Sequence, residues 1–224
     1  MIFVAEIYND KSNTIISGTS DDDTIRNGYY DEDTWYEGGS NFTTTGGSNI
    51  TINGSAGNDS IINYDGNYVT ISGDEGNDYI GNGTWIGENG DWEYYYGIFG
   101  SNSSINGGTG NDFVGNRGKN VTINGGDGDD TVVNVACIYN GKLQSADKTS
   151  INDGDGKDII YGFDDTDMLE ITGTFSTSYD SSKKEIYFKV GSTKKAITLK
   201  DFTATSFNIN NENYKINGSK FVSA

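Results

Sequence analysis

Aspartates that close short glycine-rich stretches recur along the first 158 residues of the chain. Six stretches share a frame of eight residues that opens on Ile and closes on Asp, as in Ile123-Asn-Gly-Gly-Asp-Gly-Asp-Asp130. Their closing residues are Asp23, Asp59, Asp78, Asp112, Asp130 and Asp158. A hard cation such as Ca²⁺ takes six to eight oxygen ligands, which carboxylates and the carbonyl groups of a glycine-rich loop can supply. The pattern therefore predicts a series of metal sites in which each aspartate is a ligand.

Glycines inside these stretches are the second set of predicted ligands, through their carbonyl oxygens. They are Gly57, Gly76, Gly108, Gly110, Gly126, Gly128, Gly154 and Gly156. Loops that stack at the strand spacing bring like charges within about 4.8 Å of each other, which costs about 1 kcal/mol per pair even in water. We therefore expect the metal-free chain to be unstable and Ca²⁺ to drive its folding.

The spacing of the six aspartates indicates the elements that position them. They are 36, 19, 34, 18 and 28 residues apart, which is nearly regular once two degenerate copies are admitted, at Asn41 and at Glu93 or Tyr94. The segment Asn49-Ile50-Thr51-Ile52 supports the first copy because it repeats the pattern of Asn120-Val121-Thr122-Ile123. This interpretation predicts about eight stacked coils.

Each coil reads as a glycine-acid loop, a short strand, a polar turn and a second short strand. In the second strand Val121 and Ile123 flank Thr122, the period of two that places the apolar pair inside and the threonine outside. The chain contains no proline, so every strand keeps its N–H groups for the ladder. The sequence therefore predicts an all-β fold: a right-handed parallel β-roll or β-solenoid whose two sheets enclose a thin Ile/Val core.

The tail breaks this pattern after Phe163. Alternating segments appear at Glu185–Val190 and Ala196–Leu199, separated by Gly191-Ser192, and they predict antiparallel hairpins. Because the last coil of a solenoid exposes backbone and core, a cap is required. We expect two regions: calcium-binding repeats at 1–163, with Met1–Tyr8 covering one end, and a C-terminal β cap at 164–224.

Composition restricts the function classes. A formal net charge of −18 disfavours nucleic acid and anionic membranes as partners, and no stretch of 18 apolar residues predicts a membrane span. With no His and one Cys, Cys137, zinc chemistry and Cys–His or Ser–His catalysis are disfavoured. The repeats and the cap use the whole chain, so we expect no catalytic activity.

The segment Gly125-Gly-Asp-Gly-Asp-Asp130 with Thr131-Val132-Val133 resembles the RTX (hemolysin-type) nonapeptide Gly-Gly-x-Gly-x-Asp-x-apolar-x. Gly107 to Asp112 also matches, three loops lose one glycine, and the loop that ends at Asp23 loses two. The resemblance covers residues 12–163. It implies a calcium-binding parallel β-roll that type I secretion exports unfolded through an uncleaved C-terminal signal and that folds outside the cell or on its surface.

Several alternatives remain open from the sequence. Because glycine-acid loops occur on one edge only, we expect one column of ions, whereas a metal-free solenoid would instead carry hydrogen-bonded Asn and Asp ladders. The chain could also assemble with copies of itself into filaments or a surface lattice. The aromatic clusters around Trp35 and Trp92 either form a surface for a glycan or protein partner or pack over degenerate coils. Ligand binding through the outward threonines Thr51, Thr70 and Thr122 is a further alternative.

Overall fold

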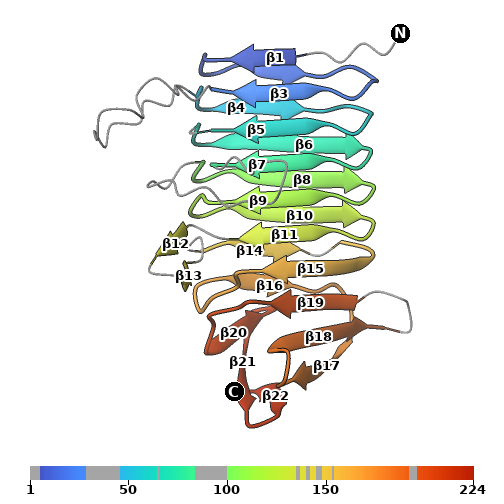
Figure 1. The fold of residues 1–224 in the computed structure, drawn as a ribbon, viewed down its shortest axis with the longest axis vertical. Coiled ribbons are helices and arrows are strands. Elements are labelled where there is room, and N and C mark those ends of the chain that lie inside the picture. The colour runs from blue at the N-terminus through green and yellow to red at the C-terminus, as the bar shows by residue number, and fades with distance from the viewer. Residues whose placement is uncertain are drawn as a thin grey trace.

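The computed structural model describes residues 6–28, 46–64, 66–83, 100–134, 137–139, 142–144, 148–152, 154–191 and 196–224. In this part of the chain the strands form two long sheets that run side by side along one axis, with the N-terminal strands at one end and the C-terminal hairpins at the other (Figure 1). The same residues contain no helix long and apolar enough to cross a membrane.

Each long sheet has ten strands, and in the parallel part each coil contributes one strand to each sheet. In spatial order, sheet A contains β1 (Glu6–Asn9), β3 (Thr24–Asn27), β5 (Ser60–Asn63), β7 (Tyr79–Asn82), β9 (Phe113–Asn116), β11 (Thr131–Asn134), β15 (Lys157–Tyr161), β19 (Ala196–Lys200), β18 (Glu185–Val190) and β17 (Phe175–Asp180). Sheet B contains β2 (Ile15–Ser17), β4 (Ile50–Asn53), β6 (Val69–Glu75), β8 (Ser104–Thr109), β10 (Thr122–Asp127), β14 (Ser150–Asn152), β16 (Met168–Glu170), β20 (Ser206–Ile209), β21 (Glu212–Asn217) and β22 (Lys220–Ser223). A separate hairpin pairs β12 (Cys137–Tyr139) with β13 (Lys142–Gln144).

The core confirms the predicted period of two. Val121 and Ile123 are buried while Thr122 between them is exposed. The parallel register also places like residues above one another, because Ile61 pairs with Ile80 in sheet A and Ile105 with Ile123 in sheet B. These columns of β-branched side chains, which suit a pleated buried surface, form one continuous core between the sheets. The coarser fold prediction, an all-β chain with two sheets dominated by parallel pairs, is therefore confirmed.

The two degenerate coils were predicted wrongly. The strand after Asp23 pairs directly with the strand after Asp59, through Ile25 and Ile61, and leaves no rung between them for a coil at Asn41. Likewise Tyr79 pairs with Phe113, which leaves no rung for a coil at Glu93 or Tyr94. Asn41, Glu93 and Tyr94 themselves lie outside the described residues, as do the aromatic clusters around Trp35 and Trp92. The spacings from Asp23 to Asp59 and from Asp78 to Asp112 therefore each correspond to one step between paired strands.

The antiparallel hairpins predicted in the tail are confirmed. β18 pairs with both β17 and β19 in the antiparallel sense, and β21 pairs with β20 and β22 in the same way. Parallel pairing continues into this region, because β19 is parallel to β15 and β16 to β14. Aromatic side chains fill the end of the core, where Phe221 lies 5.1 Å from Phe207 and 5.7 Å from Phe188 between ring centroids.

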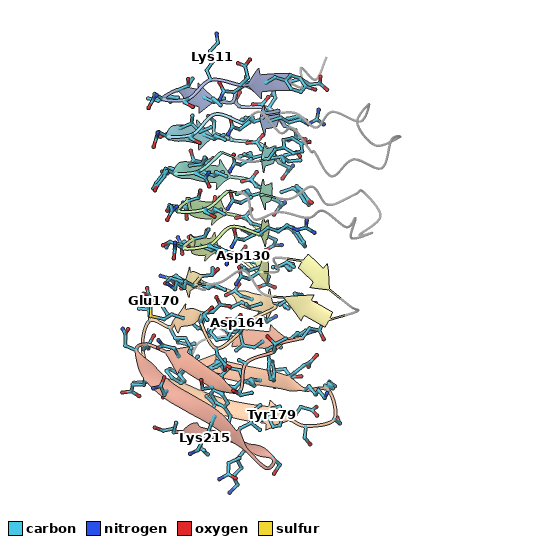
Figure 2. All side chains as sticks on the ribbon, turned by 90° about the vertical axis from the view of Figure 1, so that its left-hand side faces the viewer. Lys11, Asp130, Asp164, Glu170, Tyr179 and Lys215 are labelled. Atoms are coloured by element: carbon cyan, nitrogen blue, oxygen red, sulfur yellow. The ribbon has the colours of Figure 1, made fainter. Side chains whose placement is uncertain are left out.

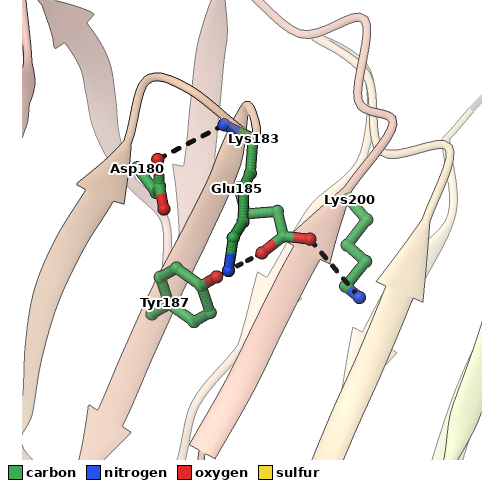
Figure 3. A network of polar contacts seen from close by, with 5 residues as sticks. All are labelled: Asp180, Lys183, Glu185, Tyr187 and Lys200. Atoms are coloured by element: carbon green, nitrogen blue, oxygen red, sulfur yellow. Dashed lines mark hydrogen bonds and ion pairs between the residues drawn. The ribbon is translucent and has the colours of Figure 1, made fainter.

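A polar network holds the outer face of this cap. Tyr187 on β18 donates a hydrogen bond to Glu185, and Glu185 forms an ion pair of 3.4 Å with Lys200 on β19 (Figure 3). Asp180 accepts a hydrogen bond of 3.3 Å from the backbone N–H of Lys183 in the adjoining turn. The Glu185–Lys200 pair joins two neighbouring antiparallel strands at partly exposed positions, and salt bridges near the surface contribute at most about 1 kcal/mol.

Candidate metal centre

The six predicted aspartates form one column along what we call the loop edge, where each glycine-acid loop connects a strand of sheet B to the next strand of sheet A. All six side chains are at most 2% exposed. Figure 2 labels Asp130 within this stack of rungs. The column ends at the cap, because the residue paired with Asp158 is Ile197, which is fully buried. The sequence therefore placed these carboxyl groups on one edge correctly, and their burial is the new observation.

In five of the six carboxylates, from Asp59 to Asp158, one oxygen accepts a hydrogen bond from the backbone of the coil before it. The N–H of Asp59 donates to Oδ1 of Asp78 at 2.8 Å, and the N–H of Asp78 donates to Oδ1 of Asp112 at 2.8 Å. The same bond recurs from Asp23 to Asp59, from Asp112 to Asp130 and from Asp130 to Asp158. These bonds fix each carboxyl group in one orientation, with its second oxygen turned into the loop.

The second oxygen distinguishes the column from an ordinary hydrogen-bonded ladder. Oδ2 is buried and accepts no hydrogen bond at Asp59, Asp78, Asp112 and Asp130. Buried polar atoms almost always have a partner, and leaving one without costs about 1–3 kcal/mol. A row of such atoms at equivalent positions therefore calls for a common explanation.

These oxygens face carbonyl groups of the next coil. A Cβ built on Gly73 would lie closer than 3.0 Å to both Oδ2 of Asp78 and the carbonyl oxygen of Gly107. A Cβ on Gly107 would approach Oδ2 of Asp112 and the carbonyl oxygen of Gly125 just as closely. Each space thus holds two negative oxygens and no donor, and only glycine leaves it open.

The predicted glycine ligands lie in the same loops. All have a backbone φ between 73° and 151°, the left-handed region. They are Gly57, Gly76, Gly108, Gly110, Gly126, Gly128, Gly154 and Gly156. The turns at Gly110 and Gly128 stack so closely that a Cβ on Gly128 would strike the carbonyl oxygen of Gly110. The carbonyl groups of successive coils are therefore lined up along the loop edge.

The opposite edge, which we call the turn edge, carries a second polar column that the sequence analysis missed. The Nδ2 group of Asn63 donates to Oδ1 of Asn82 at 2.8 Å, and that of Asn82 donates to Oδ1 of Asn116 at 2.9 Å. This asparagine ladder consists of Asn9, Asn27, Asn63, Asn82, Asn116 and Asn134, and it ends on the carboxylate of Asp167. From Asn27 onward each asparagine follows a column aspartate by four residues, a spacing that could have revealed it.

The two edges differ in how far their polar groups are satisfied. The second Nδ2 hydrogen of Asn82 donates to the carbonyl oxygen of Gly100 at 2.8 Å, and Asn63 does the same to Gly66. The turn edge is thus a hydrogen-bonded network of amides that ends on one carboxylate, Asp167. On the loop edge the carboxylates have no such partner for Oδ2 at the four positions named above.

Burial is the main cause that raises the pKa of four column carboxyls. The pKa rises to about 6 at Asp59 and Asp78 and to about 7 at Asp130, and it also rises at Asp112. The backbone N–H that binds Oδ1 partly opposes the rise in each case, and neighbouring carboxylates add to it at Asp59, Asp78 and Asp130. Without a cation, ionisation of this column at neutral pH therefore destabilises the fold.

Metal-free protein is expected to be more stable at about pH 4.5 than at about pH 7.5. A group whose pKa is raised on folding stabilises the fold below its unfolded value, near 3.9, and this contribution is lost as the pH rises through 6 to 7. The measurement is the thermal unfolding midpoint of protein stripped on a chelating resin. A higher midpoint at the neutral pH would contradict the arrangement.

A hard cation would satisfy these oxygens. Within the described residues no three His, Cys, Asp or Glu side chains converge on one point, so a site here would draw most of its ligands from backbone carbonyls. A carboxylate oxygen together with glycine carbonyls is an all-oxygen donor set, which suits Ca²⁺ and does not suit soft metals. The donor chemistry of these residues is therefore compatible with a calcium site between neighbouring coils.

The excess negative charge lies in the part of the chain that contains the glycine-acid loops. In residues 164–224 eight acidic residues balance eight basic ones, so the entire formal charge of −18 belongs to residues 1–163. A parallel roll with that charge attracts cations.

In comparisons with known proteins, no family model and no curated protein matches the chain.

Proposed function

We propose that the chain is a calcium-binding β-roll module that folds when Ca²⁺ binds between its coils. The observation that supports this function best is the row of buried Oδ2 atoms at Asp59, Asp78, Asp112 and Asp130, each turned toward the interior of a glycine loop. A cation coordinated by these oxygens would offset the free-energy penalty of burying them and would link adjacent coils. The turn edge supports a single column of ions, because its amides already satisfy one another.

The remaining features of the proposal concern winding and location. We propose right-handed winding, since connections between parallel strands of one sheet are right-handed in nearly all proteins. Extracellular calcium, at about 1 mM, is in the range in which modules of this kind bind. The resemblance to RTX repeats supports a secreted or cell-surface role with export by a type I system.

Calcium titration of stripped protein tests the function. We expect little β signal in circular dichroism without metal and a cooperative gain at about 0.1–1 mM Ca²⁺. Mg²⁺ is the control, because it demands a smaller and more regular octahedral site and should act weakly. A fully folded chain in excess chelator at neutral pH would contradict the proposal. Light scattering in the same titration separates folding of single chains from calcium-driven assembly into polymers.

A further inference from the structure

The first glycine-acid loop differs from the others in its backbone. In the frame that runs from Ile to Asp, the fourth residue has a positive φ in five loops, including 85° at Ser55 and 74° at Asp74. The first loop has Thr19 at this position, and Thr19 is not among the described residues with positive φ. A β-branched residue strongly avoids that region. The sixth position shows the same contrast, since Asp21 replaces a left-handed glycine there.

This change of backbone turns a donor toward the aspartate of the first loop. The backbone N–H of Thr19 donates to Oδ2 of Asp23 at 2.5 Å, and the Thr19 hydroxyl donates to Oδ1 at 3.2 Å. At Asp59, Asp78 and Asp112 the corresponding Oδ2 atom accepts no hydrogen bond. Asp23 therefore receives from its own loop the positive partners that the other carboxylates lack.

We infer that the loop ending at Asp23 is a metal-independent first coil, whereas the loops ending at Asp59, Asp78, Asp112 and Asp130 each take one calcium ion. This inference rests on the proposed function and deepens it. A cation at Asp23 would have to displace the Thr19 N–H from Oδ2. The loop also lacks the glycine that lines up a carbonyl at the sixth position. Thr19 thus replaces the ion and closes the column at its N-terminal end.

Calcium stoichiometry of single variants tests the inference. Native mass spectrometry or flow dialysis of the folded full chain counts the ions bound per molecule. We expect Asp23→Asn to bind as many ions as the wild type and Asp112→Asn to bind at least one fewer. The two variants remove the same charge from equally buried positions of one column, so each is the control for the other.

A gain-of-site variant gives the converse test. With Thr19→Gly and Asp21→Gly together, the first loop regains both left-handed positions and loses the threonine hydroxyl. We expect this double variant to bind one ion more than the wild type, and to lose that ion again when Asp23→Asn is added.

The outcomes separate the two ideas. If wild type binds calcium and Asp23→Asn loses an ion as Asp112→Asn does, the inference fails and the proposed function stands. If wild type binds no calcium at 10 mM, both fail. An unchanged count in Asp23→Asn with a reduced count in Asp112→Asn supports the inference even where the double variant does not fold.

Discussion

Asp78→Asn is expected to act in opposite directions with and without calcium. In stripped protein at neutral pH the amide removes a buried carboxylate whose pKa is raised to about 6, so the variant should unfold at a higher temperature than the wild type. With calcium the variant lacks a charged ligand, worth about 1.5–3 kcal/mol, so the calcium midpoint for folding should rise at least about tenfold. Thermal unfolding and calcium titration by circular dichroism measure both effects.

Glu75→Gln is the matched control for this prediction. It removes one negative charge three residues away in the same loop, but the Glu75 side chain is exposed. A screened surface charge should change either midpoint only slightly. If the two variants shift the calcium midpoint equally, general charge reduction explains the calcium response and coordination by Asp78 does not.

Asn82→Ala is expected to destabilise the fold strongly in saturating calcium. Asn82 is fully buried in the middle of the asparagine ladder, where it bonds to Asn63, Asn116 and the carbonyl oxygen of Gly100. Truncation removes one hydrogen bond from each of those three partners, at about 1–3 kcal/mol each. The expected loss is on the order of 3–5 kcal/mol in urea unfolding.

Asn124→Ala provides the comparison on the outer face of sheet B. Asn124 is half-buried, and its side chain donates to Asn106 in the neighbouring coil at 2.7 Å. Water can replace that partner, so the loss should stay below about 1 kcal/mol. Similar losses in both variants would mean that the buried ladder adds little to the stability of the fold.

The sequence predicted the residues of the core and of the loop edge because both repeat with a short period. An Ile or Val pairs with its counterpart in the next coil, so a residue type that recurs along the sequence forms a column in the structure. The position of each column aspartate follows from the same frame. Their burial and the orientation of Oδ1 and Oδ2 do not, because these depend on how closely neighbouring coils stack.

The number of rungs could not be predicted in the same way. Asn49-Ile50-Thr51-Ile52 does form a turn and a strand of the predicted kind, with Ile50 and Ile52 buried. Spacing near 36 residues can contain either two coils or one coil with an insertion, and only the pairing of Ile25 with Ile61 decides between them. The hydrogen bond from Thr19 to Asp23 could not be predicted either. In the eight-residue pattern this loop differs from the others only by its missing glycines.

The asparagine ladder determines where the chain can vary in length. The same hydrogen bond, from an asparagine Nδ2 group to a glycine carbonyl oxygen, joins Asn63 to Gly66 and also joins Asn27 to Gly47, which are much farther apart in the sequence. Asn82 and Gly100 enclose another long segment in this way. Loop closure becomes less favourable by only about 0.6 kcal/mol for each doubling of length, while the register of the strands on either side stays unchanged. The turn edge is therefore a natural position for grafting foreign peptides, which the roll would display in a row at intervals set by its own rungs.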